Sequence, residues 1–332
     1  MNIYKPTFDE ISVIIQGPLD QKINFLIKSI IEKMSESEII ISTWENNIQF
    51  IENEYLDKVV IIESSDLKSV YIDPITTVED NLHRQIHTTN IGLKKSTKKY
   101  SLKLRSDCSL INTNFLEISD ISEEFSNLLN KKITISSLGF VNPLKIPFLG
   151  YWSDFFMFGE TVDLIKYWTI NIELNYKSSY LNLIKQKFYF NNSGFLLARY
   201  GCEQQLSLNI ANHLKFNIKL NSKDDFSFDS AYKFEKISYN IFNLINYNET
   251  GITLPRRLEK GQFNKNFYTK KEFEELRKYI QSELCYKYRY EKLSKRKYYL
   301  TLINTSFYKG ILLIILYPFM RFLNIKLRIR KK

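Results

Sequence analysis

The triplet Arg105-Ser106-Asp107 places side chains that can do chemistry directly after an apolar run, YSLKLR at residues 100–105. An arginine offers five N–H donors in a fixed fork that suits phosphate, and an aspartate can accept hydrogen bonds or ligate a cation. In open α/β sheets, ligands collect beyond the carboxyl ends of the strands, which is where this triplet is expected. The alternative interpretation is a solvated loop in which Arg105 and Asp107 pair with each other.

Two further acids are candidate catalytic bases. Asp154 lies in the aromatic-rich run FLGYWSDFFMFG at residues 148–159, where partial desolvation would favour a proton-accepting role near neutral pH. The alternative there is an edge strand with one outward-facing Asp. Glu203 begins a helical run in RYGCEQQLS at residues 199–207, where an acid also simply complements the helix dipole.

A helical pattern precedes the triplet and carries two faces of different character. Leu82, Ile86 and Leu93 share an apolar face that is expected to pack on a sheet. A second stripe consists of polar or small residues: Asn81, Arg84, Gln85, Thr88 and Gly92. This stripe either faces solvent or brings Arg84 and Gln85 to a ligand, in which case the Arg84 fork could hold a phosphate.

The elements that must position these residues alternate along the chain. An amphipathic helix is predicted at residues 23–34, between short β-branched runs that predict buried strands at residues 11–15, 39–43 and 59–62. Such alternation predicts βαβ units and parallel strands whose carboxyl ends share one edge. The loops Gln16-Gly17-Pro18, Trp44-Glu45 and Arg105-Ser106-Asp107 are therefore expected to meet there.

Composition restricts the class of protein. A length of 332 residues with 44% hydrophobic content can build a large core, so global disorder is excluded. The 47 Lys and Arg residues exceed the 36 acids, but residues 286–332 alone hold thirteen basic residues and one acid. The remainder is nearly neutral, which does not fit the spread basic footprint of a nucleic-acid enzyme. The chain has three cysteines, three histidines and no CxxC or HExxH motif, so the sequence does not support a zinc site. The absence of a signal-peptide pattern favours a cytosolic location.

The basic C-terminal tail suggests a membrane surface. Residues 310–319 are almost wholly apolar, yet this run is shorter than the roughly 20 residues that span a bilayer. Seven basic residues at positions 309–332 surround it, and this pattern suits the interface of an anionic leaflet. The alternative is a core helix with a solvated basic end. The first interpretation predicts a peripheral protein on the inner face of the cytoplasmic membrane.

Several segments together resemble the WavE-type lipopolysaccharide-synthesis family. They are IIQGPL at 14–19, EIIISTWEN at 38–46, NLHRQIHTTNIGLKKSTKKYSLKLRSD at 81–107, SDFFMFG at 153–159 and EQQL at 203–206. The resemblance covers approximately residues 10–260. It implies an α/β fold with a GT-A-like, Rossmann-type mixed sheet flanked by helices. The expected domains are a nucleotide-sugar-binding catalytic domain at 1–260, a helical connection at 261–285 and the basic amphipathic tail at 286–332.

The resemblance also implies roles for the triplet. GT-A-like enzymes present the donor, and often a divalent metal, on a strand that ends in an Asp-x-Asp motif. On this analogy Arg105 stands at the place of the first Asp and Asp107 at the second. Arg105 could supply positive charge itself, which would make the enzyme metal-independent, or Asp107 could still hold Mg²⁺ or Mn²⁺ with substrate phosphates. Asp107 could instead bind a donor sugar hydroxyl or orient Arg105.

The resulting hypothesis is a glycosyltransferase that moves a sugar from a nucleotide-sugar donor to a lipopolysaccharide or capsule acceptor at the cytosolic membrane face. The nucleotide would be bound by Gln16, Gly17, Pro18, Trp44, Glu45, Arg84, Gln85 and Arg105. Asp107, Asp154 and Glu203 would be catalytic, and a wall of Tyr151, Trp152, Phe155 and Phe156 would stack on sugar rings. The rival hypotheses are a sugar-phosphate or glycerol-phosphate transferase for the same polymers and a non-catalytic assembly scaffold.

Overall fold

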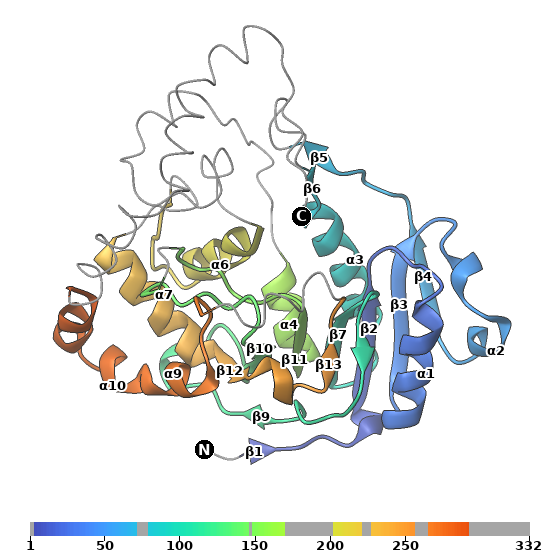
Figure 1. Cartoon of the computed structure of the whole chain (residues 1–332), viewed down its shortest axis with the longest axis horizontal. Coiled ribbons are helices and arrows are strands. Elements are labelled where there is room, and N and C mark those ends of the chain that lie inside the picture. The colour runs from blue at the N-terminus through green and yellow to red at the C-terminus, as the bar shows by residue number, and fades with distance from the viewer. Residues whose placement is uncertain are drawn as a thin grey trace, which may run out of the picture.

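A seven-stranded mixed sheet forms the centre of the computed structural model, in the order β12-β10-β11-β7-β2-β3-β4 (Figure 1). The structure describes residues 3–71, 79–145, 148–169, 202–220, 227–255 and 265–291. The strands are β2 (Ile11–Gln16), β3 (Glu38–Trp44), β4 (Val60–Ser64), β7 (Tyr100–Arg105), β10 (Ile133–Ser136), β11 (Phe156–Glu160) and β12 (Phe242–Ile245). Only β11 runs against the other strands of this sheet.

Helices cover both faces of the sheet, which explains why the strands are apolar runs rather than alternating patterns. On one face α1 (Ile23–Lys33) packs its buried side chains against Ile11, Val13 and Ile15 of β2. The other face packs against α3 (Leu82–Lys95), α4 (Thr161–Trp168), α6 (Cys202–His213) and α7 (Phe228–Ile241). The expected mixed α/β architecture is therefore confirmed.

Shorter elements complete the described chain. The remaining helices are α2 (Asn53–Leu56), α9 (Lys270–Glu275), α10 (Arg277–Ile280), and the 3-10 turns η1 (Phe8–Glu10), η2 (Ile48–Phe50), η3 (Glu123–Phe125) and η5 (Tyr247–Glu249). Three antiparallel pairs are β1 (Ile3–Tyr4) with β9 (Ile118–Ser119), β5 (Val70–Tyr71) with β6 (Glu79–Asp80), and β8 (Ser109–Leu110) with β13 (Ile252–Thr253). Residues 283–291 are also helical.

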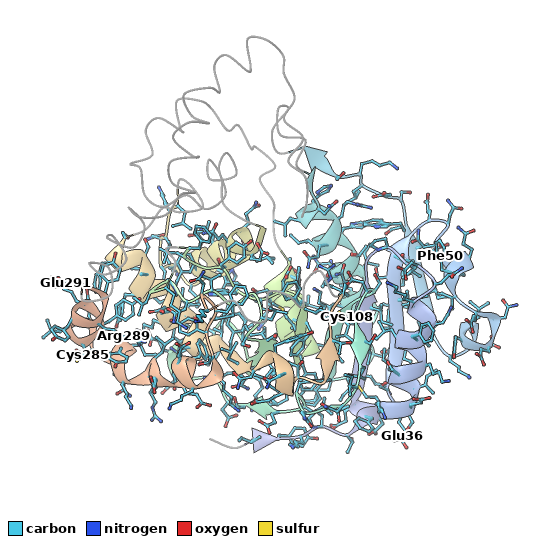
Figure 2. The ribbon with its side chains drawn as sticks, viewed as in Figure 1. Glu36, Phe50, Cys108, Cys285, Arg289 and Glu291 are labelled. Atoms are coloured by element: carbon cyan, nitrogen blue, oxygen red, sulfur yellow. The ribbon has the colours of Figure 1, made fainter. Side chains whose placement is uncertain are left out.

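The last described helical segment packs on the body of the protein. Figure 2 shows Cys285, Arg289 and Glu291 on this segment, at the opposite side of the view from Phe50. Tyr286 is fully buried and lies against Phe228 and Tyr232 of α7. The chain therefore still contributes to the core at Tyr286. The apolar and basic stretch predicted to bind a membrane lies outside the described residues, and no helix of the described chain is long and apolar enough to cross a bilayer.

Candidate functional site

Three parallel strands bring the predicted loops to one edge of the sheet, as expected. Gln16 at the end of β2 pairs with Ser42 of β3 on one side and with Arg105 of β7 on the other. The loops that follow β2, β3 and β7 consequently begin side by side. We call this region the carboxyl edge, and Cys108 in Figure 2 marks it.

Hydrogen bonds fix the Gln16-Gly17-Pro18 loop from both neighbouring strands. The Gly17 amide donates to the Ser42 carbonyl at 3.2 Å, and the Thr43 hydroxyl donates to the Gly17 carbonyl at 2.9 Å. The Ser106 hydroxyl donates to the Pro18 carbonyl at 2.6 Å. Gly17 has a φ of +114°, a backbone conformation that residues with a side chain rarely adopt. The loop is therefore held in one conformation beside the Arg105-Ser106-Asp107 triplet.

The Trp44-Glu45 loop joins an aromatic and cationic stack. Trp44 is 5% exposed, its ring lies parallel to His87 with centroids 6.1 Å apart, and the Arg84 guanidinium lies 5.0 Å from the Trp44 ring. Glu45 is exposed and accepts a hydrogen bond from the Ser65 hydroxyl at 2.6 Å. The Trp44 side chain is therefore buried beneath the carboxyl edge, whereas the Glu45 side chain lies at the surface.

Arg84 is engaged by protein groups in this structure. Its Nε lies 2.8 Å from Asp66 Oδ1, its Nη2 donates to Asp66 Oδ2 at 3.0 Å, and its Nη1 donates to Asn81 at 3.0 Å. This bidentate pair ties α3 to the segment after β4. Asp66 was not predicted, because nothing in its polar surroundings distinguishes it from other loop acids.

The polar stripe of α3 does not face solvent along its length, which corrects one of the two interpretations. Thr88 is fully buried and donates to Gln16 Oε1 at 3.1 Å. A Cβ at Gly92 would lie 2.4 Å from Ile14 Cγ2, so this glycine lets the helix approach β2 closely. Thr88 and Gly92 thus pack on the sheet, whereas Asn81 of the same stripe is exposed. The predicted apolar face, with Ile86 and Leu93, is buried in the same cluster as Ile14.

Arg105 and Asp107 form a bidentate ion pair at the carboxyl edge. Arg105 Nε and Nη2 donate to the two Asp107 carboxylate oxygens, each at 2.8 Å, and both side chains are 27% exposed. Burial acts to lower the pKa of Arg105, but the hydrogen bonds and charge of Asp107 outweigh it and raise that pKa above its usual value. The pair foreseen as an alternative is therefore present, in a partly buried position among the other loops.

Asp154 reaches the same edge because β11 is antiparallel to β7. Phe156 pairs with Leu104, so the chain entering β11 lies beside the chain leaving β7. Asp154 is 8% exposed, and Gln85 Nε2 of α3 donates to its Oδ2 at 2.7 Å. Two residues predicted for different roles, Gln85 for the donor and Asp154 for catalysis, are thus in direct contact.

A match to a family model identifies the relatives of this arrangement. The model described as WavE lipopolysaccharide synthesis matches residues 11–312, which is most of the chain. The chain belongs to the WavE lipopolysaccharide-synthesis family. The predicted family is confirmed, and the match extends beyond the residues that suggested it. A comparison with curated proteins found no match.

Solved structures resemble this WavE-family chain only distantly. The crystal structure of S. aureus TarS gives a TM-score of 0.26 at 12% identity, covering 72% of this chain and 35% of TarS. TarS 1-349 gives 0.31 at 12% identity, covering 92% and 80%, and its complex with UDP gives 0.25 at 11% identity, covering 80% and 69%. The chain thus spans about a third of the length of full TarS.

Glu203 lies on α6 and is partly exposed. Burial raises the pKa of the fully enclosed Tyr167 hydroxyl well above its usual value, and the charges of Asp154 and Glu203 add to this effect. Both predicted acids therefore act on the same buried tyrosine of α4.

The aromatic wall predicted for sugar stacking is wrong for two of its members. Trp152 and Phe156 are 3% and 2% exposed, and they pack edge-on or tilted against other core rings. Tyr151 and Phe155 are partly exposed, and Phe155 lies 6.0 Å from the Arg105 guanidinium.

The charges around Asp107 do not suit a divalent cation. Both carboxylate oxygens of Asp107 accept hydrogen bonds from Arg105, whose positive charge would repel a cation there. Within the described ranges, no group of three or more His, Cys, Asp and Glu side chains is placed to hold a metal ion. The residues present therefore fit an anionic ligand better than Mg²⁺ or Mn²⁺.

The residue most clearly missed by the sequence interpretation is Lys103, which is fully buried in β7 and donates from Nζ to the Asp154 carbonyl at 2.5 Å. Its position between Leu102 and Leu104, two residues before Arg105 and on the same face of the strand, is the one signal that could have identified it.

Proposed function

We propose that this WavE-family protein is a glycosyltransferase that moves a sugar from a nucleotide-sugar donor to a growing cell-surface glycan, lipopolysaccharide or capsule. The observation that carries the proposal is the convergence of Arg105, Asp107 and Asp154 at the carboxyl edge, where α/β sheets bind ligands. Family membership supports the involvement in lipopolysaccharide synthesis.

In the proposed complex the Gln16-Gly17-Pro18 and Trp44-Glu45 loops contact the nucleoside. The diphosphate is bound by Arg105, which has three N–H donors beyond the two that Asp107 accepts. Asp107 orients the guanidinium through its two hydrogen bonds with Arg105. Arg84, which ties α3 to the segment after β4 through Asp66, contributes positive charge at the same edge.

Asp154 is the proposed base, with Glu203 as the second candidate. The acceptor hydroxyl oxygen attacks the anomeric carbon and gives its proton to the base, while the bond from that carbon to the donor phosphate oxygen breaks. The bonding electron pair leaves with the nucleoside diphosphate, whose growing negative charge Arg105 stabilises. In this scheme the cation that assists departure belongs to the protein, so we propose that catalysis does not require Mg²⁺ or Mn²⁺.

Thermal-shift and turnover measurements with UDP-, GDP-, CMP- and dTDP-sugars test the proposal. A donor at 100 times its dissociation constant stabilises the folded protein by about 2.7 kcal/mol. We expect one class of donor to raise the melting temperature and to be consumed, with the same rate in EDTA and in Mg²⁺ or Mn²⁺. Release of a nucleoside monophosphate from a UDP, GDP or dTDP donor would instead support a sugar-phosphate or glycerol-phosphate transferase. No shift with any donor would support a scaffold.

We further propose that residues 292–332 hold the protein at an anionic membrane surface on the cytosolic side, where a lipid-linked acceptor lies. Eleven Lys and Arg residues and no acid occur in this range. Truncation must begin after Glu291, because Tyr286 belongs to the core. The full chain should sediment with vesicles that contain anionic lipid and not with neutral vesicles, and the chain ending at Glu291 should sediment with neither. Equal sedimentation of both chains would contradict this role of the tail.

A further inference from the structure

Lys103 occupies a position where the fold calls for an apolar side chain. It lies in the middle of β7, is fully buried, and pairs with Ile14 of β2 and Met157 of β11, which are also fully buried. Its neighbours Leu102 and Leu104 point to the other face, against α1. The Lys103 side chain therefore lies between the sheet and the helices of the opposite face.

The ammonium group has a specific set of contacts within this core. Lys103 Nζ donates a 2.5 Å hydrogen bond to the Asp154 carbonyl oxygen and lies 4.7 Å from the centre of the Trp168 ring of α4. Transfer of an ammonium ion out of water is costly, and a carbonyl and a ring recover only part of that cost. A methionine or leucine at this position would avoid the cost entirely. Stability therefore does not explain why a charged lysine occupies this position.

The reason lies at the carboxyl edge, because Lys103 holds one end of Asp154 and α3 holds the other. Lys103 fixes the backbone carbonyl, and Gln85 Nε2 fixes the carboxylate at 2.7 Å. We propose that Lys103 is a positioning residue that places the proposed base Asp154 and that sugar transfer requires Lys103 in its charged form. This inference rests on the proposed glycosyltransferase function.

Electrostatics around Lys103 make the charged form sensitive to pH. Burial lowers the pKa of Lys103 to about 8, and the charge of Arg105 acts in the same direction. The charges of Asp154, Cys108 and Asp107 act in the opposite direction, and Asp154 is the strongest of the three. Lys103 therefore loses its proton near pH 8, so turnover should fall as the pH rises through this value.

The chain offers a matched control in Lys132. It is 5% exposed, donates from Nζ to the Tyr239 carbonyl at 2.8 Å, and lies 4.9 Å from the Tyr239 ring. Burial lowers its pKa to about 8 as well. Lys132 immediately precedes β10, which runs parallel to β7, so it lies at the opposite edge of the sheet from Asp154. The two lysines share burial and contacts but differ in their distance from the proposed site.

The experiment compares kcat and KM for the donor between pH 6 and 9.5 in the full chain and in Lys103→Met, Lys103→Arg and Lys132→Met. For Lys103→Met we expect kcat at pH 7 to fall about 10- to 100-fold, because Asp154 would no longer be positioned to accept the proton of the acceptor hydroxyl. The KM for the donor should change less than about twofold. The decline of kcat near pH 8 should disappear in Lys103→Met. Lys103→Arg should recover part of kcat and keep it above pH 8, since arginine stays charged. Lys132→Met should retain the full profile.

An unchanged kcat and an unchanged decline near pH 8 in Lys103→Met would overturn the inference. A second measurement does not depend on turnover. With ¹³C-labelled aspartate carboxyl groups, the Asp154 resonance, assigned from Asp154→Asn, should shift near pH 8 in the full chain and in Lys132→Met but not in Lys103→Met. If this linkage is present and no donor is consumed, the proposed function fails and the positioning contact stands. If the resonance does not respond, the Lys103 inference fails even where transfer is observed.

Discussion

Replacing the buried Lys103 by methionine should change how the stability of the protein depends on pH. Methionine has a similar length, carries no charge, and can fill the space between the sheet and α4. The folded state has a Lys103 pKa of about 8, whereas the free side chain has 10.5. Folding below pH 8 therefore forces a charged group into a site that disfavours its charge.

The sign and size of the effect follow from this difference. Between pH 8 and 10.5 the unfolded chain binds more protons at Lys103 than the folded chain, so this residue makes stability rise with pH. The shift of 10.5 to about 8 corresponds to about 3 kcal/mol of destabilisation at pH 7 and only about 1 kcal/mol at pH 9.5. Lys103→Met removes this term, so its stability relative to the full chain should decrease by about 2 kcal/mol between pH 7 and 9.5.

Urea unfolding of both proteins at half-unit steps from pH 7 to 9.5 measures this difference. Lys132 titrates in the same range, because its pKa is also lowered to about 8. Its contribution occurs in both proteins and cancels when the two unfolding free energies are subtracted. The loss of packing and of the hydrogen bond to Asp154 adds an offset that does not change with pH.

Parallel stability curves for the two proteins would refute this reasoning. They would mean that Lys103 has the same pKa in the folded and unfolded states, which requires that water or a close anion compensates the ammonium in the folded state. Lys132→Met should show a pH-dependent difference of the same sign and size, since its pKa is lowered equally.

Three further substitutions test the carboxyl edge and the packing beneath it. Asp107→Ala should lower turnover of donor by more than about 100-fold, because Arg105 loses its orienting partner, and should leave the folded state detectable by circular dichroism; full activity would contradict the assignment. Gln85→Leu should lower kcat about tenfold with little change in KM for the donor, since it releases the Asp154 carboxylate; a change confined to KM would instead place Gln85 on the donor. Gly92→Ala should destabilise by about 1–3 kcal/mol in urea unfolding because its Cβ would lie 2.4 Å from Ile14 Cγ2, whereas Gly159→Ala, at 3.4 Å from Ile133 Cγ1, serves as the mild control.

The elements of the sheet were predictable because each is a short apolar run closed by polar or turn-forming residues. The run predicted at residues 11–15 is a strand at Ile11–Gln16, and the run at 39–43 is a strand at Glu38–Trp44. Once such strands are parallel, their ends must share an edge, so the meeting of the three loops followed from the pattern alone.

Contacts between distant segments were not predictable, because they depend on strand order and register. The bond between Lys103 and Asp154 exists because β11 inserts antiparallel beside β7, and no local pattern reveals that pairing. The same holds for Arg84 and Asp66, which come together only through the packing of α3 beside β3 and β4. The helical period predicted that Thr88 and Gly92 share one face of α3. It did not predict that this face packs on the sheet.

The pairing of Arg105 with Asp107 explains how a site that we propose to bind an anion can also contain an acid. Asp107 occupies Nε and one edge of Nη2, which leaves the outer edge of the guanidinium for a diphosphate. Because the carboxylate is engaged along its whole width, it fixes the plane of the fork without presenting an open oxygen pair to a cation. A phosphate that binds the outer edge therefore meets an arginine that is already oriented, and the ordering of that side chain costs little on binding. On the analogy with an Asp-x-Asp motif, we propose that Arg105, at the place of the first acid, supplies the positive charge that a metal would otherwise bring to the donor phosphates.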